Sequence, residues 1–556
     1  MVNVNQIKGI EMNTNNITRV LDEYRDTELT KDIAVLPLMV TSDNLQKAKE
    51  IISETGLYIE ANDLTEAMID DIKKVPKSEL IAYLTGKKGR RKEIMDSITD
   101  QSVAELAYKV LEIKGNDRVA DFGSGMGVFL NRCYQENPFA KYQGFENTRR
   151  MYEVSKAIAK LSESKIEFKL MDFMDLSESE DKQFDKVFAD QIDLNHLSNS
   201  RNVRKAIYND HKLGIPEHLR SGFGALVRVI IHSLKDDGRA VMLIPDTVLS
   251  ANTQDSVRKY LIKNHLLEAI ISLPAGLLLP TTRVKTNLMI LSRNNQEVRM
   301  VNATNLTVKQ GRYTGLSKEN IDSIVKLLHS TDRSMDAVTV SEDDIKNNQY
   351  SLSVNRYLLK EVTGHTVKLK EVAEVKRGIS ISQNLFMSKP DENSVQVITP
   401  AGIENDCLSN NLPYVQSEEK YGKFLTEPGQ IVIVRVGPRF KLANIKESKP
   451  LVVSGNLFVI KPDPKKINPK YLFDFLRSEI GQNELRRFLA GTAVQTISLS
   501  DLKMLSVPLK NSIEQKQIAD KFEEIDCQIE CLKKQLGELN KQKEGLSDLF
   551  ADTNLS

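Results

Sequence analysis

Apolar residues recur at helical spacing near the start of the chain. Residues 43–54, 64–75 and 78–86 each carry apolar positions three and four apart, and turn signals separate the three segments. This pattern predicts three helices, which we assign to an N-terminal helical domain of residues 1–95.

From Arg118 onward, short apolar runs alternate with amphipathic helical segments. Seven strand candidates in such an alternation predict an α/β fold with a mostly parallel, Rossmann-like sheet, in a domain of residues 96–362. The strand candidates are residues 118–123, 141–146, 166–172, 186–190, 240–245, 267–274 and 287–292.

A second strand-rich region follows, with Gly, Pro and Asn between its apolar runs. It ends in a helical pattern over residues 469–489, so we predict an α+β domain of residues 363–512. Its strand candidates are residues 367–378, 395–400, 429–437 and 456–462.

The tail, residues 513–556, has the most regular pattern in the chain. Its apolar residues alternate spacings of four and three, which are the a and d positions of a heptad repeat, and only Lys543 interrupts them. No second heptad run of this length occurs, so we predict a coiled-coil helix that pairs with another subunit. The a and d residues are Ile518, Phe522, Ile525, Ile529, Leu532, Leu536, Leu539, Leu546 and Phe550.

Composition adds limits to this picture. The chain has 556 residues and a net charge of +1, so a polyanion must be met by local basic patches rather than by a global field. No apolar stretch approaches the roughly 20 residues of a membrane span, and a cytoplasmic protein is expected. A basic run over residues 87–92 fits a solvated face and a phosphate contact equally well.

The cysteines suggest no chemistry. None of the four lies in a C-x-x-C pair, which argues against a zinc site or a disulfide framework. Cys527 and Cys531 are four residues apart, and we interpret them as small apolar residues on one helix face.

A glycine-rich segment, D-F-G-S-G-M-G at residues 121–127, follows the first strand candidate and opens a helix. Such a turn lets backbone approach a ligand and directs helix N–H groups at it. Glu146 ends the next strand, where a carboxylate can accept from ribose hydroxyls, and Asp172-Phe173 could bind the amino group of an adenine and flank its ring.

Together these residues resemble the cofactor motifs of S-adenosylmethionine-dependent methyltransferases more than a dinucleotide fingerprint, whose third glycine is missing. An ordinary tight turn with incidental acids is the alternative. The predicted cofactor residues are Asp121, Gly123, Ser124, Gly125, Glu146, Asp172 and Phe173.

The resemblance extends to a family. Residues 234–250, 265–294 and 347–358 are similar to the modification (M) subunit of type I restriction-modification systems, which is an N6-adenine DNA methyltransferase. This resemblance implies that a target adenine is extruded from the duplex. Its amino group would be held by an N-P-P-F or N-P-P-Y tetrapeptide, whose aromatic ring stacks on the base.

That tetrapeptide is altered here. Residues 190–193 read D-Q-I-D, so Asp190 can still accept from an amino group, but Asp193 stands where an aromatic ring should stack. Residues 98–100 read I-T-D in place of the Y/F-T-P motif of the family. These departures predict a domain that binds S-adenosylmethionine without transferring its methyl group. The alternative is retained methylation, with an aromatic such as Phe188 or Phe223 taking over the stacking.

Residues 365–550 resemble half of a specificity (S) subunit of the same systems, with one target-recognition domain and a long helix. The resemblance implies base contacts in the major groove, for which Arg, Gln and Asn are the informative side chains. Each candidate alone also fits a phosphate contact or a solvated charge. The DNA-contact candidates are Lys376, Arg377, Arg435, Arg439, Lys441, Thr492 and Gln495.

We therefore predict a sequence-specific DNA-binding subunit of a restriction-modification or related phage-defence system, with a methyltransferase fold and a degraded catalytic motif. An active N6-adenine DNA methyltransferase that uses D-Q-I-D is the second hypothesis. The third, an RNA or protein methyltransferase, is disfavoured by the resemblance of the C-terminal half. Expected partners are duplex DNA, a second copy or another subunit at the C-terminal helix, and translocase or nuclease subunits. No G-x-x-x-x-G-K-[ST] segment occurs in this chain.

Overall fold

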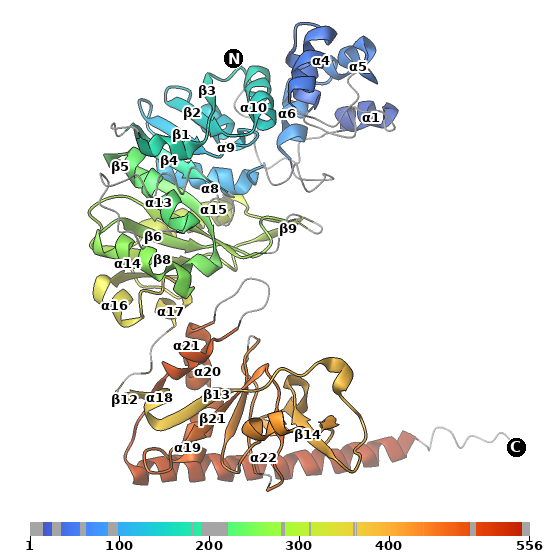
Figure 1. The fold of residues 1–556 in the computed structure, drawn as a ribbon, viewed down its shortest axis with the longest axis vertical. Coiled ribbons are helices and arrows are strands. Elements are labelled where there is room, and N and C mark those ends of the chain that lie inside the picture. Colours follow the sequence, from blue (N-terminus) through green and yellow to red (C-terminus); the bar gives the residue numbers. More distant parts are fainter. Residues whose placement is uncertain are drawn as a thin grey trace, which may run out of the picture. The chain divides into compact units, whose positions relative to one another are not determined.

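The chain forms two compact units, which are described separately below (Figure 1). The first unit comprises residues 1–358 and 491–493, and the second comprises residues 359–490 and 494–556. The computed structural model describes residues 15–24, 35–55, 63–86, 98–178, 183–190, 221–279, 284–310, 313–359, 362, 364–437, 439–446, 448–489 and 496–547.

The first unit begins with helices, including the three that the sequence predicts. Asn44 and Thr65 have extended backbone conformations, and their side chains accept hydrogen bonds from backbone N–H groups of the helices that follow them. Buried residues of these helices share one apolar cluster with Met126 and with residues of α10 (Arg149–Leu161). The N-terminal helices are α1 (Asn15–Glu23), α3 (Val35–Thr41), α4 (Leu45–Glu54), α5 (Glu66–Lys73) and α6 (Lys77–Thr85).

A nine-stranded sheet forms the centre of the first unit, and all seven predicted strands belong to it. The strand order is β11-β8-β6-β7-β5-β4-β1-β2-β3. The strands from β5 to β3 in this order pair in parallel, whereas β7 runs antiparallel to both β5 and β6. The strands are β1 (Arg118–Phe122), β2 (Lys141–Glu146), β3 (Ile166–Leu170), β4 (Phe184–Ala189), β5 (Leu234–Pro245), β6 (Leu267–Ser272), β7 (Thr286–Leu291), β8 (Glu297–Asn302) and β11 (Ala337–Ser341).

Both faces of this sheet are covered, which explains why its strands are apolar on both sides. Val119 of β1 packs into one layer, and Ala120 and Phe122 pack into the other. The first layer contains α8 (Gln101–Leu111), α9 (Val128–Glu136) and α15 (Lys318–His329). The second contains the 3-10 turns η3 (Phe173–Glu178) and η4 (Asp246–Leu249), and α13 (Gly222–Ser233), α14 (Asp255–Lys263), α16 (Glu342–Asn347) and α17 (Asn355–Leu358). The turn η5 (Asn252–Gln254) and the hairpin of β9 (Val308–Gln310) and β10 (Tyr313–Gly315) complete this unit.

The second unit is an α+β structure built on a four-stranded antiparallel sheet of order β13-β21-β18-β19. Its strands are β13 (Ala373–Arg377), β21 (Leu457–Pro462), β18 (Ile431–Val434) and β19 (Leu442–Asn444). Smaller sheets join β17 (Tyr414–Gln416), β14 (Ser394–Ile398) and β20 (Val452–Val453), then β12 (Thr366–Lys368) and β22 (Ser506–Pro508), and β15 (Ile403–Glu404) and β16 (Cys407–Leu408). Its 3-10 turns are η6 (Gln383–Leu385), η7 (Pro400–Gly402) and η8 (Glu419–Phe424).

Two predicted elements of the second unit are interrupted. Residues 367–378 do not form one strand, because the helical turn α18 (Leu369–Val372) separates β12 from β13 and buries Leu369. Residues 469–489 form two helices, which meet at Ser478. The helices of this unit are α18, α19 (Pro469–Arg477), α20 (Glu479–Arg487), α21 (Leu499–Lys503) and α22 (Ser512–Ser547).

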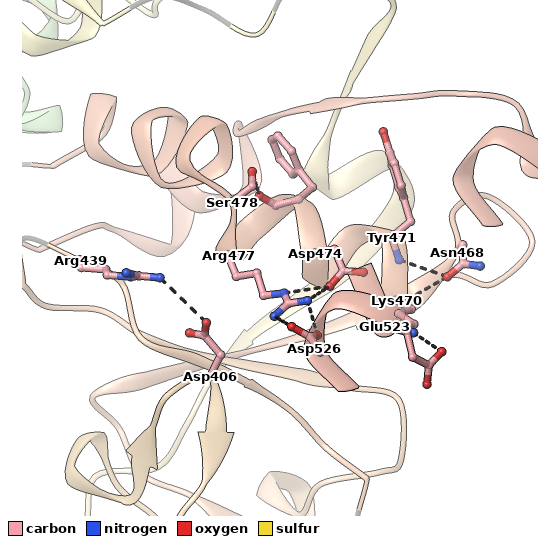
Figure 2. Close-up of polar contacts among 11 residues, drawn as sticks. Asp406, Arg439, Asn468, Lys470, Tyr471, Asp474, Arg477, Ser478, Glu523 and Asp526 are labelled. Atoms are coloured by element: carbon pink, nitrogen blue, oxygen red, sulfur yellow. Dashed lines mark hydrogen bonds and ion pairs between the residues drawn. The ribbon is translucent and has the colours of Figure 1, made fainter. Parts of the chain in front are cut away.

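The long helix α22 is fastened to α19 within the N-terminal half of α22 (Figure 2). Arg477 of α19 donates to the buried carboxylate of Asp474 at 2.9 Å and to Asp526 of α22 at 2.5 and 3.0 Å. Its guanidinium also lies 5.4 Å from the centre of the Phe473 ring and 5.2 Å from that of Phe522. The described a and d residues of the predicted seam from Ile525, beside this anchor, to Leu539 are 44–63% exposed.

None of the described helices is both long enough and apolar enough to cross a membrane.

Candidate functional site

The glycine-rich loop joins β1 to α9 at the carboxyl edge of the first sheet. Gly123, Gly125 and Gly127 all have positive φ, from 51° to 76°, a region that side chains with a Cβ rarely occupy. The backbone N–H groups of Gly123 and Ser124 both donate to the carbonyl of Phe145, so the loop is held against the end of β2. The Ser124 hydroxyl is buried and has no hydrogen-bond partner in the described part of the chain.

Glu146, the last residue of β2, is buried beside this loop. One carboxylate oxygen accepts from the N–H of Gly125 at 3.1 Å. The other accepts from the N–H and the hydroxyl of Thr148 at 2.9 and 2.7 Å. A carboxylate offers about four lone-pair sites, so Glu146 retains capacity for a ligand hydroxyl.

Three carboxylates gather at the ends of neighbouring parallel strands. Asp121 is near the end of β1, Glu146 ends β2, and Asp190 directly follows β4. Burial, together with the charges of Asp190 and Glu146, raises the pKa of Asp121 well above its ordinary value. A cationic ligand at this edge of the sheet would relieve the repulsion among these acidic groups.

Asp172 and Phe173 lie at the end of β3, next along the same edge. The Asp172 carboxylate accepts from the N–H of Met174 at 2.9 Å and so begins the turn η3. The Phe173 ring is stacked on Phe122, with centroids 5.2 Å apart and planes within 3°. One face of the Phe173 ring is thus occupied by the core of the protein.

The structure corrects one alternative for the catalytic motif. Phe188 and Phe223 are fully buried, and Phe188 packs on Phe129 with ring centroids 4.2 Å apart. Because both rings are packed inside the core, neither is accessible for stacking on a target base. Asp190 is buried, while Asp193 lies outside the described residues.

The altered residues 98–100 have a structural role. Ile98 is buried in the cluster of the N-terminal helices. The Asp100 carboxylate accepts from the N–H of Ser102 at 2.9 Å, which caps α8.

A polar network that sequence analysis did not single out occupies the same edge beyond β5 and β6. The Asn287 amide donates to Asp246 at 3.3 Å and its oxygen accepts from the Ser272 hydroxyl at 2.6 Å. Lys285 completes the network, 3.5 Å from Asp246. In the sequence, the only indication of this network is that its residues lie at the ends of predicted strands.

Most of the described DNA-contact candidates are gathered at one end of the four-stranded sheet. Arg377 ends β13, Arg435 follows β18, and Arg439 and Lys441 precede β19, and antiparallel pairing brings these ends together. Lys376, next to them on β13, forms an exposed ion pair with Glu374 at 2.9 Å.

These basic residues differ in their surroundings. Arg377 donates to the carbonyl of Gly455 at 2.9 Å, and the Arg435 guanidinium lies 5.5 Å from the centre of the Phe458 ring. Partial burial and the charge of Arg377 lower the pKa of Arg435. Residues 87–92, Thr492 and Gln495 lie outside the described residues.

The geometry first defines a class. The first unit is an α/β protein that presents a glycine-rich loop and acidic strand ends at the carboxyl edge of its sheet, where such folds bind nucleoside-containing ligands. The sequence model of the N-6 DNA Methylase family matches residues 82–365, about half of the chain, and the chain belongs to that family. The model of the type I restriction modification DNA specificity domain matches residues 361–541. An M-type methylase domain and an S-type specificity domain are therefore fused in one chain.

Individual relatives agree with both matches. The chain is 24% identical over 390 residues to the type I restriction enzyme MjaVII methylase subunit of Methanocaldococcus jannaschii, covering 65% of each chain. It is 30% identical over 188 residues to the putative MjaX specificity subunit of the same organism, covering 32% of this chain and 43% of the relative. The chain thus spans less than two thirds of the length of these relatives.

Among solved structures, the methyltransferase subunit of a type I restriction-modification system from Streptococcus thermophilus is 19% identical. It matches with a TM-score of 0.45, over 61% of this chain and 78% of the other.

Proposed function

We propose that this chain is a sequence-specific DNA-binding subunit of a restriction-modification or related phage-defence system, and that it binds S-adenosylmethionine but has a degraded catalytic motif. The observation that carries the proposal is the contrast between the glycine-rich loop with Glu146, on one side of the site, and the end of β4, on the other. The loop and Glu146 are assembled for a ligand, whereas no aromatic residue at the described end of β4 is free of the core.

The residues at the loop fit S-adenosylmethionine. Glu146 would accept from the ribose hydroxyls. The buried Ser124 hydroxyl, which has no hydrogen-bond partner among the described residues, would bond to a polar group of the ligand. Asp121 and Asp190 are buried acidic groups near the loop, and a cationic sulfonium or ammonium group beside them would counter the repulsion that raises the pKa of Asp121. Asp172 and Phe173 would contact the adenine at the end of β3.

When bound, the cofactor supplies an electrophilic methyl group, and methyl transfer to adenine would need this chain to hold the target amino group. Asp190 could accept a hydrogen bond from that amino group and orient its lone pair. The retention of this buried carboxylate at the end of β4 favours the alternative function, an active N6-adenine DNA methyltransferase.

The second unit would recognise DNA through the basic end of its four-stranded sheet. Arg377, Arg435, Arg439 and Lys441 would contact phosphates and base edges, with Lys376, Thr492 and Gln495 as further candidates. One recognition domain would read one half of a split site.

The exposed seam of α22 supports pairing with a second copy or another subunit. The described seam residues from Ile525 to Leu539 extend for roughly 21 Å of helix, at 1.5 Å per residue, without a covering element of the second unit. Two copies joined there would read a site with two-fold symmetry, and translocase or nuclease subunits would supply any cleavage.

Titration calorimetry with S-adenosylmethionine, followed by a tritiated-methyl transfer assay on mixed-sequence duplex DNA, tests the proposal. Binding without transfer supports it. Methyl transfer by the wild-type protein that is abolished in Asp190→Ala would establish the alternative function, an active N6-adenine DNA methyltransferase. Absence of cofactor binding would mean that the first sheet has only a structural role.

A further inference from the structure

The loop that carries two of the proposed DNA contacts has one buried residue at its centre. Phe440 is fully buried in the core of the second unit, between Arg439 and Lys441, which are both exposed. Arg439 and Lys441 thus flank a side chain that is fixed in the core, while their own side chains are exposed to solvent. The backbone groups of Phe440 face the protein interior and need hydrogen-bond partners there.

One side chain supplies both partners. The Gln482 amide oxygen accepts from the N–H of Phe440 at 2.9 Å, and its amide nitrogen donates to the carbonyl of Phe440 at 3.0 Å. The same nitrogen donates to the carbonyl of Leu476 at 2.9 Å, which ties the contact to the end of α19. Gln482 is 3% exposed, so these bonds are shielded from water.

The helix that carries Gln482 is itself held firmly. The N–H of Gln482 donates to the carbonyl of Ser478 at 2.8 Å, and Leu485 of the same helix is fully buried in the core. Gln482 is therefore a rigid support beneath a surface loop, a position that fixes where the loop backbone runs.

The charges around the loop leave Arg439 available for a ligand. Arg439 forms an ion pair with Asp406 at 4.0 Å, and the Arg439 side chain is 66% exposed (Figure 2). An ion pair this long and this exposed contributes little, so it does not compete strongly with a phosphate or a guanine.

We infer that Gln482 is a positioning residue for DNA recognition: its amide fixes the Phe440 backbone and so presents Arg439 and Lys441 to DNA in one arrangement. This inference rests on the proposed DNA-binding function. Fixing the loop before binding removes part of the entropy that binding would otherwise lose.

The test compares two buried glutamines of the second unit. Gln515 is 4% exposed and also bridges backbone, because it accepts from the N–H of Asn468 at 2.8 Å and donates to the carbonyl of Lys510 at 2.7 Å. Neither bond involves a described DNA-contact candidate. Full-length Gln482→Met and Gln515→Met proteins keep similar side-chain volume and lose the bonds. Their affinity is measured for a duplex that the wild-type protein selects from a randomised pool, and their stability by thermal unfolding.

We expect Gln482→Met to raise the Kd for the duplex roughly tenfold. We also expect it to reduce the magnitude of the slope of log K against log salt concentration by about one to two, whereas Gln515→Met should leave both quantities unchanged. In an Arg439→Ala, Lys441→Ala background the Gln482 change should have no further effect on Kd, because it acts through those two side chains. Gln482→Asn, which keeps the amide but withdraws it by one methylene, should give a smaller loss and serves if Gln482→Met does not fold.

The outcomes separate two failures. If the wild-type protein selects no duplex, the proposed DNA-binding function is wrong, and so is this inference. If the wild-type protein binds, but Gln482→Met matches Gln515→Met or retains its effect in the double-alanine background, the inference alone is wrong.

Discussion

At the scale of single residues, the site depends on charges that the fold brings together. The motif around residues 121–127 and Glu146 could be read from the sequence, because glycine spacing and strand ends are local features. The mutual repulsion of Asp121, Glu146 and Asp190 could not, because these residues are up to 69 positions apart and meet only when their strands pair.

Asp121 should make the stability of the ligand-free protein depend on pH. An unfolded Asp has a pKa of about 3.9, and the folded value is raised, so the folded chain binds this proton more tightly. This contribution to the unfolding free energy is fully present below the unfolded pKa and is lost as pH rises through the folded pKa.

We therefore expect Asp121→Asn to flatten the decline of the unfolding free energy above about pH 4, as measured by urea denaturation at a series of pH values. The exposed Asp343→Asn is the control and should leave the profile unchanged. Equal slopes in wild type and Asp121→Asn would contradict the assignment.

Arg477 should matter more for stability than its neighbouring ion pairs. Replacing it by Leu leaves the Asp474 carboxylate buried without its cation, and burial already raises the pKa of Asp474. We expect a loss of about 2–4 kcal/mol in urea denaturation, somewhat below a fully buried pair because Asp526 is exposed. Lys470→Ala breaks the exposed pair with Glu523 and should cost under about 1 kcal/mol. Similar losses in the two variants would argue against a buried anchor.

At the scale of elements, hydrophobic periodicity located seven of the nine strands of the first sheet and the long C-terminal helix, but not β8 and β11. It could not show the break between α19 and α20, because the apolar spacing of residues 469–489 continues through Ser478. The break depends on a close approach: a Cβ at Gly481 would lie 1.9 Å from the carbonyl oxygen of Phe475.

Two glycine substitutions should consequently change the free energy of unfolding in opposite directions. Gly481→Ala forces α20 away from α19, and we expect a destabilisation of at least about 2 kcal/mol, typical of overpacking in a core. Gly537→Ala on α22 meets no neighbour within 4 Å and should stabilise the helix by about 0.5–1 kcal/mol. Urea denaturation of both full-length variants measures this, and a neutral Gly481→Ala would show that the turn can relax.

At the scale of the whole molecule, a methylase domain and a specificity domain share one chain, and α22 carries an exposed apolar seam. Its anchored end, around Arg477 and Asp526, belongs to the second unit, so assembly through α22 would place recognition domains in pairs.

Leu532→Glu combined with Leu536→Glu should convert a self-associated protein to a monomer without loss of fold, because both side chains are about 60% exposed in the single chain. Light scattering after size exclusion measures the mass, and circular dichroism the fold. Cys527→Ser with Cys531→Ser changes exposed positions outside the seam and should leave the mass unchanged. A monomeric wild-type protein would contradict pairing with a second copy.

The sequence by itself determined seven of the nine strands of the first sheet, the glycine-rich loop, the tail helix and the family resemblance, since each depends on residues that are near one another in the chain. The tertiary structure alone decided that β7 is inserted antiparallel between β5 and β6, and that Phe188 and Phe223 belong to the core. It also placed Gln482 beneath Phe440, 42 residues away. These features depend on contacts between distant segments, and the free energy of packing and of buried hydrogen bonds selects them only when the chain is folded.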